Sequence, residues 1–209
     1  GKPRKLVIFL NPIGGKQNAR SIYQKTAGPL FELAGILCEV LVSERHRHFT
    51  DLVAAFDFSS VDGMVIFGGD GSVCEILNAL MRKTYGQEVK DPKPIDIPMA
   101  VIPTGTGNGF SEGLYGVQNE LTAILHVING TILPQPLMSV HSGGSLLSMS
   151  CCVIAYGLFS DVMYHTDKQR WLKKLRYAVV PLWVMLWKKQ RLFNARVTYK
   201  VRYRTHCLF

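Results

Sequence analysis

The chain has 209 residues, enough for one large domain or two small ones, and 47% of them are apolar, so it can bury a sizeable core. The formal net charge of +9 is unevenly spread: the last 42 residues, from Lys168 onward, carry 12 of the 24 Lys and Arg and none of the 15 Asp and Glu. The longest apolar run, Tyr177 to Trp187, is 11 residues long and contains Pro181, which excludes a bilayer-spanning helix there.

The basic C-terminal segment suits phosphates or an anionic membrane surface, and equally an ordinary solvated face. Trp and Leu are interleaved with its basic residues, so no nucleic-acid partner is expected. The five cysteines are odd in number and form no C-x-x-C pair, which predicts reduced thiols. No signal-peptide pattern is present at the start of the sequence. These features predict a cytoplasmic protein that is recruited peripherally to membranes.

Short apolar runs alternate with helical patterns through the first 131 residues. Strands are predicted at 5–10, 37–42, 64–67 and 99–102. Helices are predicted at 18–34, with a possible kink at Pro29 and an end at Gly35, and at 49–56, 72–83 and 121–129. This alternation predicts an α/β fold with a Rossmann-like, doubly wound parallel sheet. We assign residues 1–131 to this nucleotide-binding domain.

The pattern changes after residue 131. Strands are predicted at 137–142, 146–155 and 197–203, with a hairpin turn at Gly143-Gly144, and these indicate the start of an antiparallel β-sandwich over 132–209. Between them, residues 161–187 carry apolar side chains at steps of three and four. Two interpretations of this segment stay open: a helix pair packed on the sheet, or a lipid gate at a membrane surface.

Three of the predicted parallel strands end in glycine turns: Asn11-Pro-Ile-Gly-Gly-Lys16, Gly68-Gly-Asp-Gly71 and Pro103-Thr-Gly-Thr-Gly-Asn108. Parallel strands place their carboxyl ends at one edge, where ligands of doubly wound sheets bind. Glycine turns that lead into helices present backbone N–H groups to phosphates. A carboxylate inside such a turn repels phosphate unless it takes part in chemistry. Asp70 is therefore our candidate general base, with an N-cap in a tight turn as the alternative.

These three motifs, in this order and spacing, resemble the diacylglycerol kinase catalytic domain family, and within it the sphingosine kinase and ceramide kinase branch. The segment from Asp161 to Tyr177 adds to the resemblance, which covers nearly the whole chain. It implies a two-domain lipid kinase that uses ATP and Mg²⁺. Asp70 would accept the proton of a lipid hydroxyl, and Asp161 would lie in the lipid pocket. It further implies these cofactor-binding residues: Asn11, Pro12, Ile13, Gly14, Gly15, Lys16, Ser43, Glu44, Arg45, His46, Arg47, Gly68, Gly69, Gly71, Glu75, Gly105, Thr106, Gly107, Arg170 and Arg176.

Two departures from the family pattern bear on function. Sphingosine kinases typically carry a second aspartate two residues after the position of Asp161, where this chain has Met163. Burying a sphingoid ammonium without a carboxylate is costly, which favours ceramide, whereas the Gly105 to Gly109 segment is closer to sphingosine kinases. We slightly prefer sphingosine. The family's sandwich also extends further, so the resemblance implies a C-terminally truncated chain, and a non-catalytic nucleotide- or lipid-binding module is the further alternative.

Overall fold

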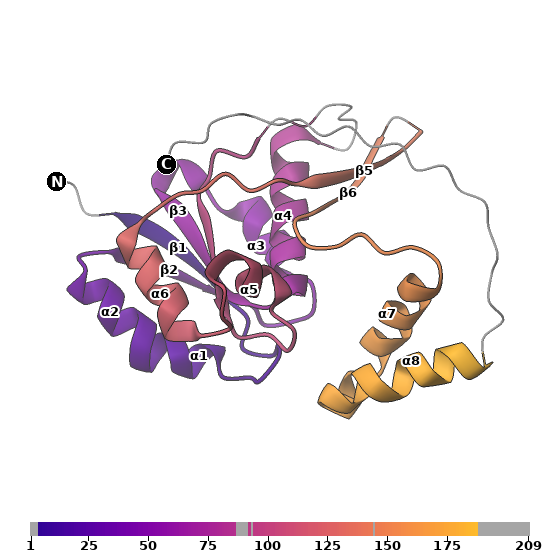
Figure 1. Ribbon diagram of the computed structural model, residues 1–209. Coiled ribbons are helices and arrows are strands. Elements are labelled where there is room, and N and C mark those ends of the chain that lie inside the picture. The colour runs from indigo at the N-terminus through magenta and orange to yellow at the C-terminus, as the bar shows by residue number, and fades with distance from the viewer. Residues whose placement is uncertain (1–3, 87–91, 93, 144, 188–209) are drawn as a thin grey trace. The chain divides into compact units, whose positions relative to one another are not determined.

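The computed structural model describes residues 4–86, 92, 94–143 and 145–187 (Figure 1). The strand predicted at 197–203 lies outside these residues, as does Cys207. Contacts divide the chain into two compact units, with the boundary after Ile154. This division does not test the domain boundary predicted near residue 132, which stays a prediction.

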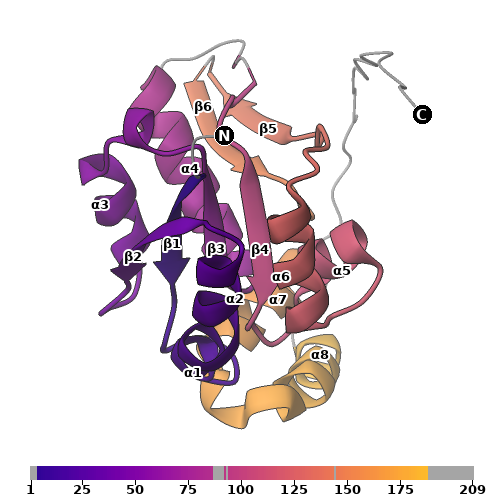
Figure 2. The same ribbon diagram turned by 90° about the vertical axis from the view of Figure 1, so that its left-hand side faces the viewer.

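The first unit is built on a four-stranded parallel sheet, as the sequence predicts. Its strands are β1 (Lys5–Leu10), β2 (Leu37–Val42), β3 (Gly63–Gly68) and β4 (Met99–Pro103). They are arranged in the order β2-β1-β3-β4 (Figure 2). All three pairings are parallel, so every strand ends at the same edge of the sheet.

The helices of the first unit cover both faces of this sheet. They are α1 (Ala19–Ile22), the π-helical turn η1 (Tyr23–Ala27), α2 (Gly28–Leu33), α3 (His48–Ala55), the 3-10 turn η2 (Phe58–Ser60), α4 (Asp70–Tyr85), α5 (Gly109–Tyr115) and α6 (Glu120–Asn129). One core cluster joins α1, η1, α2 and α6 to one face of the sheet, and a second joins α3 and α4 to the other (Figure 1). The result is a three-layer α/β/α arrangement.

Strand β1 shows why both faces need a helical cover. Successive side chains of a strand point to opposite faces. Leu6, Ile8 and Leu10 enter the α1/α2/α6 cluster, whereas Val7 and Phe9 enter the α3/α4 cluster. A continuous apolar run is what a parallel strand buried on both faces requires, and this run made the strand predictable.

The helical segment predicted at 18–34 is present, but its interior differs from a plain α-helix. Proline has no N–H and interrupts the hydrogen-bond ladder of a helix. Just before Pro29, the Gly28 N–H donates to the Tyr23 carbonyl five residues back, which is the bond of a π-helical turn. The wider turn places the proline at the start of α2. Gly35, with φ of +68°, follows the helix end as predicted.

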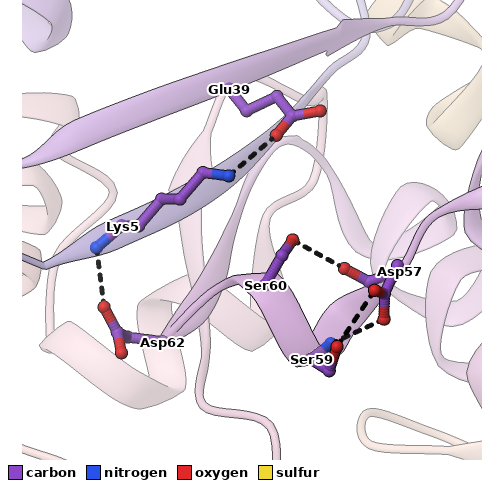
Figure 3. Close-up of polar contacts among 6 residues, drawn as sticks. All are labelled: Lys5, Glu39, Asp57, Ser59, Ser60 and Asp62. Atoms are coloured by element: carbon purple, nitrogen blue, oxygen red, sulfur yellow. Dashed lines mark hydrogen bonds and ion pairs between the residues drawn. The ribbon is translucent and has the colours of Figure 1, made fainter.

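The amino ends of the strands carry polar contacts (Figure 3). The Lys5 N–H donates to Asp62 over 2.7 Å, and its ammonium lies 3.5 Å from Glu39 on β2. Nearby, Asp57 accepts hydrogen bonds from the hydroxyl and the N–H of Ser59, which lower the pKa of its carboxyl group. These charged groups lie at the opposite end of the strands from the glycine turns.

A β-hairpin, β5 (Met138–Ser142) with β6 (Ser145–Ser150), is antiparallel and completes the first unit. The sequence predicted that the second strand would extend to residue 155, and this is wrong. Ser150 pairs with Met138, the first residue of β5, so no partner strand remains for the residues that follow. Met149 packs with Leu77 and Met81 of α4, which places the hairpin against that helix.

The second unit is helical over residues 158–187, which agrees with the helix pair of the first interpretation of 161–187; the packing of this pair on the sheet and a role at a membrane stay predictions. It contains α7 (Leu158–Lys168), the 3-10 turn η3 (Arg170–Leu175) and α8 (Arg176–Trp187). The His165 and Trp183 rings meet edge to face, with centroids 5.3 Å apart, and join α7 to α8. Within the described part of the chain, no helix combines the length and hydropathy that crossing a bilayer demands.

Candidate active site

The glycine turns lie at the carboxyl edge of the sheet. The chain leaves β1 toward β2 on one side and later returns to β3 on the other side, so the topology reverses between β1 and β3. Ligands of doubly wound sheets bind at such a switch point. The two turns that flank it are 11–16, after β1, and 68–71, after β3.

Asn11 organises the turn after β1. Its N–H donates to the Phe67 carbonyl of β3 over 3.0 Å. Its side-chain Oδ1 accepts from the N–H groups of Ile13 and Gly14 at 3.2 and 2.9 Å, and its Nδ2 donates to Ser72 Oγ at 3.0 Å. This one side chain therefore shapes its own turn and joins it to the first turn of α4.

The three glycine turns contact one another through backbone atoms. Gly15 has φ of +57°, and a Cβ there would lie 2.2 Å from the Thr104 carbonyl oxygen. A Cβ on Gly105 would lie 2.4 Å from the Gly69 Cα. Both distances are far below a normal contact, so no side chain fits at either position. The predicted convergence of the three turns at one edge is confirmed.

The turn after β4 is closed by a side chain that was not in our predicted site. Asn108 is buried, with φ of +57°. Its Oδ1 accepts from the Gly105 N–H at 2.8 Å, and its Nδ2 donates to the Gly105 carbonyl at 3.1 Å. Asparagine tolerates this left-handed conformation better than most residues. The position of Asn108 at the end of the glycine-rich motif is the sequence signal that could have identified it as a site residue.

Asp70 is half-buried on the first turn of α4, and its carboxylate faces the turn after β4. Its Oδ2 accepts from the Gly109 N–H at 3.1 Å, and its Oδ1 accepts from the Phe110 N–H at 2.9 Å. A Cβ on Gly107 would lie 3.3 Å from Oδ2. The carboxylate thus lies among the glycine turns and away from the core. Each oxygen keeps a further lone pair that can accept a proton.

Gly71 differs from the other glycines of this edge. A Cβ built there meets nothing within 4 Å, and its φ is not in the left-handed range. Neither packing nor backbone conformation requires a glycine at this position. Gly71 is exposed, so the space beside it, next to Asp70, is open.

The turn after β2, residues 43–47, lies at the same edge. The Ser43 N–H donates to the Leu10 carbonyl of β1 at 2.9 Å, and its hydroxyl donates to the Arg45 carbonyl at 3.1 Å. The Arg45 guanidinium pairs with Asp51 of α3. The remaining predicted residues of this turn, Glu44, His46 and Arg47, are exposed.

Glu75 contributes to this turn indirectly. Its Oε1 accepts from the Thr50 N–H in the first turn of α3 at 3.1 Å. An acceptor at the start of a helix satisfies an N–H that has no partner within the helix. Glu75 therefore holds the start of α3, and with it the end of the 43–47 turn, against α4.

Three predicted residues belong to the second unit. Asp161 lies in the first turn of α7. Arg170 begins η3, and its side chain lies outside what the structure describes. The Arg176 guanidinium donates to the Tyr177 hydroxyl at 2.9 Å and lies over that ring at 4.8 Å from its centroid. Their predicted contacts with nucleotide and lipid stay predictions.

The profile of the diacylglycerol kinase catalytic domain matches residues 5–140, which include β1 to β4 and all four turns at the carboxyl edge. The chain belongs to the diacylglycerol kinase catalytic domain family. Within this family it is similar to ceramide kinase of Mus musculus, at 32% identity over 84% of this chain and 34% of that protein. It is equally similar to sphingosine kinase 1 of Arabidopsis thaliana, at 32% identity over 87% of this chain and 37% of that protein.

Solved structures of this family agree with the fold. A crystal structure of a diacylglycerol kinase from Bacillus anthracis matches with a TM-score of 0.51 and 26% identity, over 70% of this chain and 46% of that one. The chain thus spans about a third of the length of the curated relatives it matches and about half of the length of the matched structure.

Proposed function

We propose that this chain is the nucleotide-binding part of an ATP-dependent lipid kinase that phosphorylates the primary hydroxyl of a sphingoid lipid. One observation carries the proposal: Asp70 is held by two backbone N–H groups at a point where three glycine turns meet, beside open space at Gly71. The similarity to named ceramide and sphingosine kinases supports the lipid class of the acceptor.

In the proposed reaction, Asp70 accepts the proton of the lipid hydroxyl as its oxygen attacks the terminal phosphorus of ATP. The bond from that phosphorus to the bridging oxygen breaks, and ADP leaves with the electron pair. Such transfers depend on positioning and on neutralising phosphate charge. The hydrogen bonds from Gly109 and Phe110 fix the orientation of the carboxylate, which is what a general base needs.

The glycine turns and the nearby cations have the chemistry that phosphates require. Backbone N–H groups of 11–16, 68–71 and 105–107 are proposed to hold the triphosphate. Lys16 and Arg47 are proposed to contribute positive charge at the same edge, and Arg45 is proposed to do so on leaving its ion pair with Asp51. Arg170 and Arg176 are proposed to add forked donors from the second unit, a geometry suited to phosphate.

Mg²⁺ is proposed to accompany the nucleotide. In kinase-like sites this ion is held by one or two carboxylates together with phosphate oxygens and water. The ion would neutralise phosphate charge during transfer.

The acceptor lipid is proposed to be sphingosine, with ceramide as the second candidate. Asp161 offers a single carboxylate for a sphingoid ammonium, and Met163 stands where sphingosine kinases typically have a second one. Ceramide has a neutral amide at that position and needs no such partner. Relatives of both kinds match this chain at 32% identity.

The protein is proposed to act in the cytoplasm and to contact anionic membranes peripherally. The acid-free segment from Lys168, with 12 Lys and Arg, supports electrostatic attraction to such a surface. Co-sedimentation with vesicles of neutral and of anionic lipid tests this: binding that is equal for both lipids, or unaffected by salt, would contradict it.

The activity is tested with labelled ATP and separate vesicles of sphingosine, ceramide and diacylglycerol. The 209-residue chain is compared with one extended by the rest of a relative's sandwich. Asp70→Asn is expected to abolish turnover and to keep ATP binding. Asp62→Asn is the matched control, because Asp62 also accepts a backbone N–H but lies at the amino end of the strands. Near-normal turnover by Asp70→Asn would contradict the role of Asp70. ATP binding without turnover in both chains would favour a non-catalytic module.

A further inference from the structure

Three cysteines that are distant in sequence form a compact thiol cluster. Cys74 lies on the second turn of α4, and Cys151 and Cys152 follow the end of β6. Their Sγ atoms all lie within 4.8 Å of one another, and those of Cys151 and Cys152 are 3.6 Å apart. All three side chains are half-buried, and none is in a disulfide. Across the described residues, no other group of three or more His, Cys, Asp or Glu side chains is this close.

Hydrogen bonds hold the two sides of this cluster in place. Asn78, one turn after Cys74 on α4, donates from Nδ2 to the Met149 carbonyl at 2.8 Å and accepts the Met149 N–H on Oδ1 at 2.8 Å. The same Nδ2 also donates to the Cys74 carbonyl at 2.7 Å. On the other side, the Cys152 N–H donates to the Ser150 hydroxyl at 3.3 Å. The geometry is therefore set by α4 and β6 together (Figure 1).

We propose that Cys74, Cys151 and Cys152 bind one thiophilic metal ion, with Zn²⁺ or another d¹⁰ cation as the class of occupant. Metal–thiolate bonds of ~2.3 Å place the sulfurs of a tetrahedral site about 3.8 Å apart. Since the sulfurs lie within 4.8 Å of one another, side-chain rotation that closes the cluster by about 1 Å would reach this spacing. The ligand set is sulfur only, which selects soft cations over Mg²⁺ or Ca²⁺.

Binding at this cluster would join α4 to the hairpin close to Asp70. Asp70 and Cys74 are four residues apart on α4, so they lie on the same side of the helix, one turn from each other. A bound ion would therefore fix the first turns of α4 relative to β6. The proposal stands on the sulfur geometry alone and does not require the proposed kinase activity.

Titration of the reduced 209-residue chain with Cd²⁺ tests the site. The thiolate-to-metal absorption in the ultraviolet is expected to saturate at one ion per chain, and the melting temperature is expected to rise. Each of Cys74→Ser, Cys151→Ser and Cys152→Ser is expected to weaken binding at least about tenfold, since even changes outside the ligand shell cost 10–100-fold. Cys38→Ser is the control and is expected to bind as the parent does, because Cys38 lies outside the cluster.

Saturation at no defined ratio, equal weakening by the Cys38→Ser control, or unchanged binding in all three cluster variants would overturn the proposal. If a cluster variant fails to fold, the site is tested in the parent chain by alkylation of its cysteines. Cd²⁺ is expected to protect Cys74, Cys151 and Cys152 from alkylation and to leave Cys38 reactive, as read by peptide mass spectrometry. Equal protection of Cys38, or no protection of the cluster, would contradict the site. Both the Cd²⁺ titration and the alkylation measurement read metal binding directly, so neither depends on kinase activity.

Discussion

Replacing Gly71 with alanine separates what the fold requires from what a ligand requires. Gly71 lies in the first turn of α4, and an added Cβ meets no atom within 4 Å. Where the native backbone conformation suits alanine, a Gly→Ala change stabilises a protein by about 0.4–1 kcal/mol, chiefly because it restricts the unfolded chain. Gly71→Ala is therefore expected to raise the free energy of unfolding by about that amount, as measured by urea denaturation.

The same methyl group is expected to weaken nucleotide binding. If the open space beside Gly71 holds phosphates, the methyl would overpack the complex, and overpacking costs about 1–3 kcal/mol. That corresponds to a rise of about 5- to 150-fold in the Kd for ATP, as measured by calorimetry. Gly113→Ala on α5 is the matched control, because its Cβ also meets nothing within 4 Å. It is expected to gain stability and to bind ATP normally.

The ATP-binding measurement and the stability measurement test different parts of this prediction. Normal ATP affinity in Gly71→Ala would show that the space beside this residue is not the phosphate site. A loss of stability in Gly71→Ala would show that the backbone there is less tolerant than its geometry indicates. Weakened ATP binding in the Gly113→Ala control would trace the effect to helix stability instead of the site.

Three further predictions concern the same unit. Gly105→Ala is expected to destabilise the fold by about 1–3 kcal/mol in urea denaturation, because its Cβ would lie 2.4 Å from the Gly69 Cα; unchanged stability would contradict the close packing of the turns. Asn78→Ala removes both bonds to Met149 and is expected to speed amide hydrogen exchange in β6, whereas unaltered exchange would mean that apolar packing alone holds the hairpin. Hydrogen bonding, led by the Cys151 thiol, lowers the pKa of Cys74, whereas burial raises the pKa of Cys38, so in metal-free protein the alkylation of Cys74 is expected to reach its midpoint at lower pH than that of Cys38; equal midpoints would contradict this.

The sequence predicted the four parallel strands well because each is bounded by strong signals. The apolar run of β1 ends at an Asn-Pro turn, and the bounds 5–10 and 37–42 are those of β1 and β2. Helix α5 was missed because its seven residues include Gly109 and Gly113, which give a weak helical pattern. The end of β6 was placed too late because residues 151–155 are apolar, and only the partner strand decides where pairing stops.

The candidate site likewise contains residues that the local sequence indicates and contacts that only the tertiary structure shows. The glycine turns and Asp70 were found from local order alone, since glycine and a following helix mark such turns in any sequence. The roles of Asn11 and Asn108 within those turns depend on bonds that the motif indicates only in part. Glu75 was placed near the site by resemblance, but its bond to Thr50, which holds the start of α3, is a tertiary contact.

The sequence by itself determined the alternation of strands and helices and the position of each glycine turn, because these depend on residues that are neighbours along the chain. Only the tertiary structure decided which distant groups meet. Asn78 and Met149 are 71 positions apart, and their pairing brings Cys74 beside Cys151 and Cys152. No spacing rule links such positions, because the distance between them is set by the packing of a helix against a hairpin.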